Sequence, residues 1–361
     1  MQELKTILET TCDLIRFRTT PDNPAEIERC LSYARDFLKT AGWMTEDFVN
    51  NGTKSLYAGS NREPKILFAA HLDVVPAEEV QFGPKEINGR LYGRGALDMK
   101  SGTAVLLHLL AEIGPRPEIG LILTTDEETG GFNGTKFVLE QGIMPKVVIL
   151  PDGGKDWQNI VHKEKGVLWV KVVAQGKPAH GSVPWQGENA ILKLNKALES
   201  ITSGFLPHAE HPDDHWVATC NIGKIEGGTA SNKVAETASA VCDIRLTEND
   251  NPDGVFEKLV SSMPEGINLE KLLDEPLVFV PQDNPIIQVY AEAIKTQGGN
   301  PKFTLDYGSS DARFFTPQNI PVILSQPTGD GHHGIDEWVD IASIQKYHDT
   351  VREFIRLYAG F

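Results

Sequence analysis

The chain has 361 residues, of which 40% are hydrophobic and 23% charged, and its formal net charge is −16. This composition is typical of a globular protein, and the length favours two domains over one. The acidic charge argues against a nucleic acid partner, and no apolar run reaches the ~18 residues of a membrane span, so no membrane partner is expected. Four dispersed cysteines without a CxxC motif favour a reducing, cytoplasmic setting over a disulfide framework.

The first half of the chain alternates between helical and strand patterns. Apolar residues from Leu4 to Ile15 recur at helical spacing, and Asn23-Pro24 is a typical helix start for a second helix that ends at Gly42. Asn51-Gly52 predicts a hairpin. The following segments predict strands at 66–70, 119–124 and 147–150, with helices at 99–113 and 136–141. This alternation predicts an α/β fold with a mostly parallel sheet.

The pattern changes near Gly166. Strands are expected at 167–174, 216–225, 238–246 and 277–280, with helices at 189–201 and 255–262. Beyond residue 281 the α/β pattern resumes, with helices at 285–297, 311–315 and 341–358 and a strand at 321–325. We therefore predict a discontinuous catalytic domain, residues 1–166 and 280–361, and an inserted α+β domain, residues 167–279.

Metal-ligand side chains follow the predicted strands. His71 and Asp73 end the first buried strand, and being two residues apart they face the same way, so one could bind a metal while the other orients it. Further candidates in the joins between elements are Asp98, Glu127, Glu128, Asp152, His332 and His333. In a largely parallel sheet, ligands bind beyond the carboxyl ends of the strands. Imidazoles and carboxylates suit zinc, and a carboxylate can bridge two ions, so the pattern predicts a hydrolytic metal centre.

Four motifs together resemble those of the M20 metallopeptidase family. They are His71-Leu-Asp-Val-Val-Pro76, Gly93-Arg-Gly-Ala-Leu-Asp-Met-Lys100, Thr125-Asp-Glu-Glu-Thr-Gly130 and His333-Gly-Ile-Asp-Glu337. The resemblance spans nearly the whole chain. It implies a di-zinc exopeptidase-like catalytic domain with an inserted lid and dimerisation domain. It also implies hydrolysis of the amide bond of a small N-acyl amino acid or a short peptide, with Co²⁺ or Mn²⁺ as possible substitutes for the two Zn²⁺.

The resemblance also assigns roles to individual residues. His71 and Asp152 would bind one zinc, Glu128 and His333 the other, and Asp98 would bridge both through a loop with a cis Asp98–Met99 peptide. Asp73 would steady His71. Glu127 would be the general base for a hydroxide that bridges the metals. His333 is preferred to His332 because only His333 fits the family pattern His-x-x-(Asp/Asn)-Glu.

Substrate-contacting residues are implied mainly in the insert. His180, in Gly176-Lys-Pro-Ala-His-Gly-Ser-Val-Pro184, would stabilise the oxyanion in the partner subunit of a homodimer; a turn-capping or surface role is the alternative. Asn232 would contact substrate, and Arg245 could clamp a carboxylate or simply pair with Asp243. Gly308 and Ser309 would line the substrate pocket, either as an anion-binding helix start or as an ordinary capped one.

The identity of the substrate stays open at this point. Many deacylases of the family have Glu where this chain has Asp152, whereas dipeptidase-like and aminopeptidase-like members more often have Asp. A deacylase or desuccinylase is the first expectation, a dipeptidase the second, and a non-catalytic binding protein the third. A histidine cluster at His208, His211 and His215 is interpreted as solvated.

Overall fold

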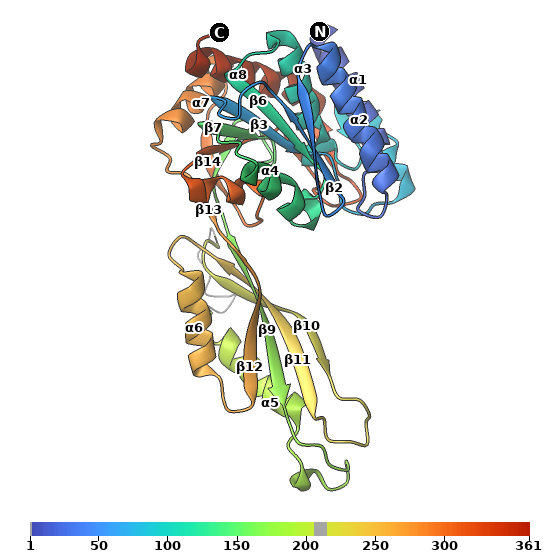
Figure 1. Cartoon of the computed structure of the whole chain (residues 1–361), viewed down its shortest axis with the longest axis vertical. Helices are drawn as coiled ribbons and strands as arrows, with labels where there is room; N and C mark the ends of the chain where they lie inside the picture. The colour runs from blue at the N-terminus through green and yellow to red at the C-terminus, as the bar shows by residue number, and fades with distance from the viewer. Residues whose placement is uncertain (1, 206–214) are drawn as a thin grey trace. The chain divides into compact units, whose positions relative to one another are not determined.

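The computed structural model describes residues 2–205 and 215–361, so His208 and His211 lie outside the described part (Figure 1). The chain divides into two compact units, one of residues 1–163, 279–306 and 310–361 and one of residues 164–278 and 307–309. The predicted boundaries were after residues 166 and 279, and the short 307–309 segment was not foreseen as part of the second unit. Among the described helices, none is long and apolar enough to cross a lipid bilayer.

A nine-stranded sheet runs through the first unit, and its middle strands are parallel (Figure 1). Its strands are β1 (Thr45–Asn50), β2 (Thr53–Ala58), β3 (Ile66–His71), β6 (Ile119–Thr124), β7 (Val147–Leu150), β8 (Asn159–Glu164), β13 (Val278–Phe279), β14 (Lys302–Asp306) and β15 (Val322–Leu324). β3 runs parallel to β6 and β7, and β7 parallel to β15. Every residue of these four strands is buried, which is why they are continuous apolar runs rather than alternating ones. The predicted α/β class with a mostly parallel sheet is confirmed.

The helices of this unit begin within two residues of the predicted positions. They are α1 (Gln2–Arg16), α2 (Pro24–Thr40), α3 (Ser101–Ile113), α4 (Phe137–Glu140), α7 (Pro285–Thr296) and α8 (Ile341–Ala359). Asn23 accepts a hydrogen bond from the Glu26 N–H, and Asp340 accepts one from the Ser343 N–H, so each caps its helix. α3 contacts β3 as well as α1, α2 and α8, and its apolar surface is therefore buried nearly all round.

A second, four-stranded sheet in this unit was not predicted. It has the order β16-β17-β5-β4. Its strands are β4 (Lys85–Ile87), β5 (Arg90–Tyr92), β16 (Gly329–Asp330) and β17 (Trp338–Asp340). Strands of two or three residues are too short to show a periodicity of two, and β5 pairs with β17 more than 240 residues further along the chain. This pairing brings two loops of the site together.

The second unit is an antiparallel sheet with helices on one face. The sheet has the order β10-β11-β9-β12. Its elements are β9 (Gly166–Gln175), β10 (Thr219–Gly227), β11 (Thr237–Leu246), β12 (Ile267–Glu275), α5 (Ala190–Thr202) and α6 (Pro252–Ser262). Leu168, Val170 and Val172 of β9 share a buried cluster with residues of both helices, whereas the alternate residues face away from it. β12 was not predicted.

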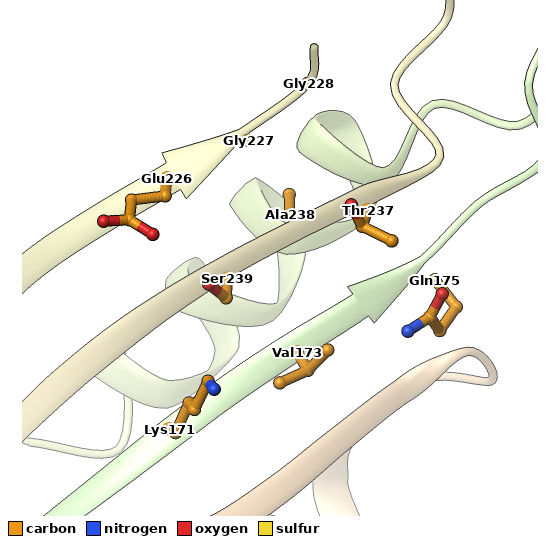
Figure 2. A pocket seen from close by; sticks show the side chains of 9 residues that line it. All are labelled: Lys171, Val173, Gln175, Glu226, Gly227, Gly228, Thr237, Ala238 and Ser239. Atoms are coloured by element: carbon orange, nitrogen blue, oxygen red, sulfur yellow. The ribbon is translucent and has the colours of Figure 1, made fainter.

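The other face of this sheet carries a shallow polar pocket (Figure 2). It is lined by Lys171, Val173, Gln175, Glu226, Gly227, Gly228, Thr237, Ala238 and Ser239. None of the residues predicted for the catalytic or substrate site lines it. The chemistry predicted from the sequence therefore lies elsewhere.

Candidate metal centre

His71 is the last residue of the buried strand β3, and Asp73 lies two residues further on. The Nδ1 of His71 lies 3.0 Å from the backbone oxygen of Asp73 and 3.6 Å from its carboxylate. The backbone oxygen is therefore the hydrogen-bond acceptor that orients the ring, and Nε2 is left to face the site. The Asp73 carboxylate instead accepts the N–H of Glu128 at 3.0 Å, which ties the two strand ends together.

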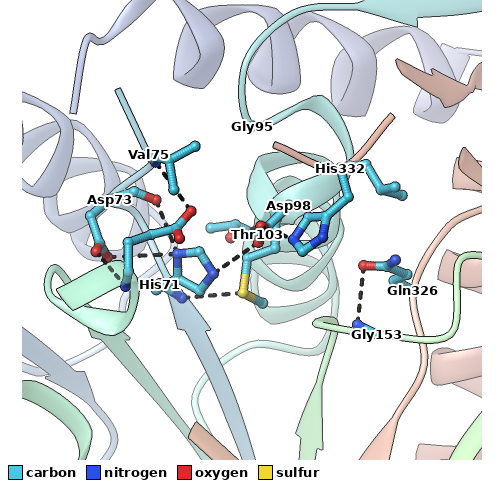
Figure 3. A network of polar contacts seen from close by, with 12 residues as sticks. His71, Asp73, Val75, Gly95, Asp98, Thr103, Gly153, Gln326 and His332 are labelled. Carbon is cyan, nitrogen blue, oxygen red and sulfur yellow. Dashed lines mark hydrogen bonds and ion pairs between the residues drawn. The ribbon is translucent and has the colours of Figure 1, made fainter. Parts of the chain in front are cut away.

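Asp98 lies at the centre of the polar network, as Figure 3 shows. The Asp98–Met99 peptide is cis, as the family resemblance implied. One carboxylate oxygen of Asp98 lies 3.1 Å from His71 Nε2, and the other lies 2.5 Å from His332 Nε2 and 3.1 Å from His333 Nε2. The two oxygens thus face opposite halves of the site, which is the arrangement a bridging carboxylate needs.

Glu127 and Glu128 lie on a single 3-10 turn, Glu127–Thr129, directly after β6. Glu128 lies 3.2 Å from His333 Nε2 and accepts the N–H of Val75 at 3.2 Å. Glu127 has a carboxylate oxygen within 4.8 Å of ligand atoms of His71 and Asp152. The turn therefore sends the two neighbouring side chains to different parts of the site.

The site concentrates buried negative charge. Burial, with the charges of Asp98 and other carboxylates, raises the pKa of Asp152 to about 7 and the pKa of Glu127 well above its ordinary value. Hydrogen bonds with Asp98 and Glu128 raise the pKa of His333 to about 10. Burial opposes ionisation of Asp98, yet hydrogen bonds from the three histidines hold its pKa well below the ordinary value. Bound cations would relieve this excess of negative charge.

The donor set fits divalent metal ions. His71, Glu127 and Asp152 offer ligand atoms within 4.8 Å of one another, and so do Asp98, His332 and His333. Imidazole nitrogens and carboxylate oxygens are the ligands that zinc binds in hydrolases. These two groups contain four of the five predicted ligands, and the fifth, Glu128, lies 3.2 Å from His333 Nε2. The contact between His71 Nε2 and Asp98 at 3.1 Å links the two groups.

Three residues outside the predicted site also contribute to it: His332, Arg94 and Glu337. The His332 ring lies tilted against that of His333, with 3.9 Å between the ring centroids, and also contacts Asp98, although His332 lies outside the family pattern. Arg94 and Glu337 form a buried ion pair behind the metal-ligand loops. Both residues lie within the quoted motifs, so their positions were visible but their mutual contact was not.

Two motif loops of the second unit lie side by side. His180 forms a β-bridge with Lys233, and the Gly181 N–H donates to the Asn232 oxygen at 2.7 Å. His180 and Asn232 are both exposed, and the His180 ring contacts the Ser182 hydroxyl at 2.7 Å. The structure therefore places His180 and Asn232, two of the three residues predicted in the insert to contact substrate, on one surface of that unit.

Arg245 makes the ion pair that was its alternative role. Its Nε and Nη2 donate to the two oxygens of Asp243 at 2.9 and 3.1 Å. Gly308 is exposed and Ser309 is partly buried, but the helix predicted after them is only a four-residue 3-10 turn, Asp311–Phe314. Ser310 accepts the Ala312 N–H, which fits the ordinary capped start, one of the two alternatives for this loop.

The fold and the metal-ligand constellation define a metal-dependent hydrolase. Residues 67–357 match the model of peptidase family M20/M25/M40, and the chain belongs to this family. The third expectation, a non-catalytic binding protein, is therefore set aside.

Relatives and solved structures of this family cover nearly the whole chain. The chain is 27% identical to a succinyl-diaminopimelate desuccinylase of Rhodospirillum centenum, over 96% of both proteins, and 28% identical to one of Rickettsia akari, over 95% of this chain and 97% of that protein. The fold is similar to a tripeptidase of Staphylococcus aureus (TM-score 0.81, 21% identity, 99% of both chains). It is also similar to an M20 metallo-carboxypeptidase of Sulfolobus solfataricus (TM-score 0.80, 20% identity, 98% of this chain and 99% of that one).

Proposed function

We propose that this protein is a two-zinc hydrolase that cleaves the amide bond of a small N-acyl amino acid. The observation that carries the proposal is the position of Asp98, whose two oxygens each lie 3.1 Å from a different metal-ligand histidine, His71 and His333. His71 and Asp152 would hold one ion, Glu128 and His333 the other, and Asp98 would be shared. Co²⁺ or Mn²⁺ could replace Zn²⁺ at ligands of this type.

The residues around this pair supply the remaining chemistry. Two bound cations would polarise the scissile carbonyl and lower the pKa of a water molecule. Glu127 reaches the same group as His71 and Asp152. It would take a proton from the attacking water and return it to the leaving amine, for which a raised carboxyl pKa is favourable. Asp73 would hold His71 and Glu128 in place through its backbone oxygen and its carboxylate.

Peptide hydrolysis is the second candidate. Curated relatives at 27–28% identity are named desuccinylases, which supports an acylated amino acid as substrate. Asp152, where many deacylases of the family have Glu, supports the alternative of a dipeptide or tripeptide. The relatives that are named desuccinylases align with nearly the full length of this chain, and we therefore rank deacylation above peptide hydrolysis.

The insert supports a homodimer in which His180 acts on the partner's substrate. β10 is an edge strand, and Ile222 and Ile225 on it are exposed, as are Ile191 and Leu192 on α5. Exposed apolar side chains on an edge strand favour pairing with a second copy. Light scattering on the purified chain tests this: a mass of one chain would exclude a role for His180 in the partner's site.

The four cysteines form no disulfide bonds, which supports a cytoplasmic setting.

The role of Glu127 gives the sharpest test of the mechanism. Replacing it by alanine removes the proposed base but no proposed metal ligand. We expect the rate of hydrolysis to fall by about 10²- to 10⁴-fold while zinc content, measured by plasma emission spectrometry, stays at two ions per chain. Glu140→Gln, at an exposed glutamate of α4, is the matched control. Unchanged hydrolysis in Glu127→Ala would refute the proposed mechanism.

The substrate class is decided by a panel of N-succinyl and N-acetyl amino acids and free-amine dipeptides, each assayed with Zn²⁺, Co²⁺ and Mn²⁺. Preferential turnover of acylated amino acids supports the first candidate. If only the free-amine dipeptides are hydrolysed, the deacylase proposal is wrong and the peptidase takes its place.

A further inference from the structure

A buried ion pair lies directly behind the metal-ligand loops. Arg94 Nη1 donates to Glu337 Oε2 at 2.5 Å, and the two side chains are 3% and 0% exposed. A buried ion pair is weak evidence for stability, because the loss of hydration offsets most of the attraction. Its other contacts therefore decide what this pair does.

The Glu337 carboxylate holds the loop that carries Asp98. Oε1 accepts the N–H groups of Leu97 and Asp98 at 2.9 and 3.1 Å, and Oε2 accepts the Gly95 N–H at 3.1 Å. Three backbone N–H groups within four residues of the loop are thus bound to one carboxylate. A shift of Glu337 would move the bridging side chain itself.

Arg94 holds the loop that carries His333. Its Nη2 donates to the backbone oxygens of His333 and Gly334 at 2.9 and 3.1 Å. His333 has φ of 58°, in the left-handed region that is unfavourable for residues with a Cβ. Such a conformation persists where the surroundings hold it, and Arg94 binds the carbonyl group that this conformation presents.

The two loops come from distant parts of the chain. The pairing of Tyr92 with Trp338, where β5 meets β17, sets their register, and the Gly93 N–H donates to the backbone oxygen of Glu337 at 3.1 Å. Arg94 lies two residues after Tyr92, and Glu337 lies directly before Trp338. They are positioned to transmit the alignment of one loop to the other.

We propose that Arg94 and Glu337 form a positioning clamp that aligns Asp98 with His333. Arg94 sets the affinity for the metal ion held by Glu128 and His333, and Glu337 sets the affinity for both ions through the shared Asp98. This inference rests on the proposed two-metal function. Arg94 contacts the His333 loop, whereas His71 and Asp152 lie on β3 and after β7, so loss of Arg94 should weaken one ion selectively. Glu337 contacts the loop of the shared Asp98, so its loss should weaken both.

Arg94→Lys tests the selective effect. Lysine keeps the charge but presents no planar guanidinium to reach Glu337 and both carbonyl groups at once. Titration of the metal-free protein with Zn²⁺, followed by calorimetry and by competition with a chelator, should show two ions in the wild type. In Arg94→Lys one affinity should fall by about 10- to 100-fold, the usual effect of losing a residue that orients a ligand, while the other is unchanged.

The weakened ion is assigned in a His71→Ala background. That variant should retain the ion at Glu128 and His333, and adding Arg94→Lys should weaken this remaining ion. Glu337→Gln should lower both affinities, because an amide offers one acceptor where the carboxylate offers two. Arg356→Lys is the matched control, since Arg356 also binds a glutamate, Glu353, through two hydrogen bonds of 2.8 Å but on an exposed helix.

A folding defect is separated by a double variant, Arg94→Met with Glu337→Leu. It leaves neither charge of the pair buried alone, and its melting curve shows whether it folds. The folded double variant should still bind both ions weakly. Two unchanged affinities in Arg94→Lys, or in the folded double variant, would overturn the clamp. A wild-type protein that binds fewer than two ions would instead refute the proposed function.

Discussion

At the scale of single residues, the site depends on close packing as much as on its ligands. Gly102, at the start of α3, lies against Pro151, the residue before Asp152. A Cβ added to Gly102 would lie 2.8 Å from Pro151 Cγ and still closer to its Cβ. The α3 helix and the loop carrying Asp152 can approach this closely only because residue 102 has no side chain.

Gly102→Ala should therefore destabilise the protein and move Asp152. We expect a loss of about 1–3 kcal/mol in the free energy of unfolding, measured with urea, because the inserted methyl group has no space. Zinc affinity should fall together with stability. Gly254→Ala is the control: a Cβ there meets nothing nearer than 3.6 Å in α6, and the variant should gain stability, by roughly 0.5–1 kcal/mol. Equal effects of the two substitutions would contradict this explanation.

The role of Asp73 is divided between its backbone oxygen and its carboxylate. Asp73 was expected to orient His71, and it does so through its backbone oxygen, while its carboxylate binds the Glu128 N–H. The sequence spacing predicted the partnership but not the atoms. His332 was set aside for want of a motif, yet its ring contacts Asp98. A motif does not report contacts made by the residue next to it.

At the scale of elements, the well-predicted parts carry local signals. The parallel strands β3, β6 and β7 are apolar runs, and α2 begins at an Asn-Pro capping signal, so both follow from a few consecutive residues. The small strands β5 and β17 carry no such signal. Their pairing nevertheless positions the Asp98 and His333 loops, because each loop adjoins one of these strands.

At the scale of the whole molecule, the acidic charge has a consequence for stability. Net charge is −16, and burial together with neighbouring carboxylates raises the pKa of Asp126 to about 6 and that of Asp152 to about 7. The ordinary value for both is 3.8. Each group binds its proton more tightly in the folded chain than in the unfolded one, so protonation stabilises the folded state.

The metal-free protein should therefore melt at a higher temperature near pH ~5.5 than near pH ~8, by a few degrees. This stabilisation is complete below the ordinary pKa and is lost as the pH rises through about 6 and about 7. Bound zinc should remove much of the dependence, because a cation stabilises the ionised carboxylates. Calorimetry of metal-free, zinc-loaded and Asp152→Asn proteins checks this. A metal-free protein that is more stable at the higher pH would contradict it.

The sequence by itself determined the α/β class, the positions of the helices, the family and the five proposed metal ligands, because each can be recognised from local patterns or motifs of a few consecutive residues. Only the tertiary structure decided that Asp98 faces two histidines, that His332 joins them and that Arg94 and Glu337 join two loops. The contacts with His332, His333 and Glu337 connect residues more than 200 positions apart, and even His71 and Asp98 are 27 positions apart. No periodicity or spacing along the chain encodes which strand ends will meet.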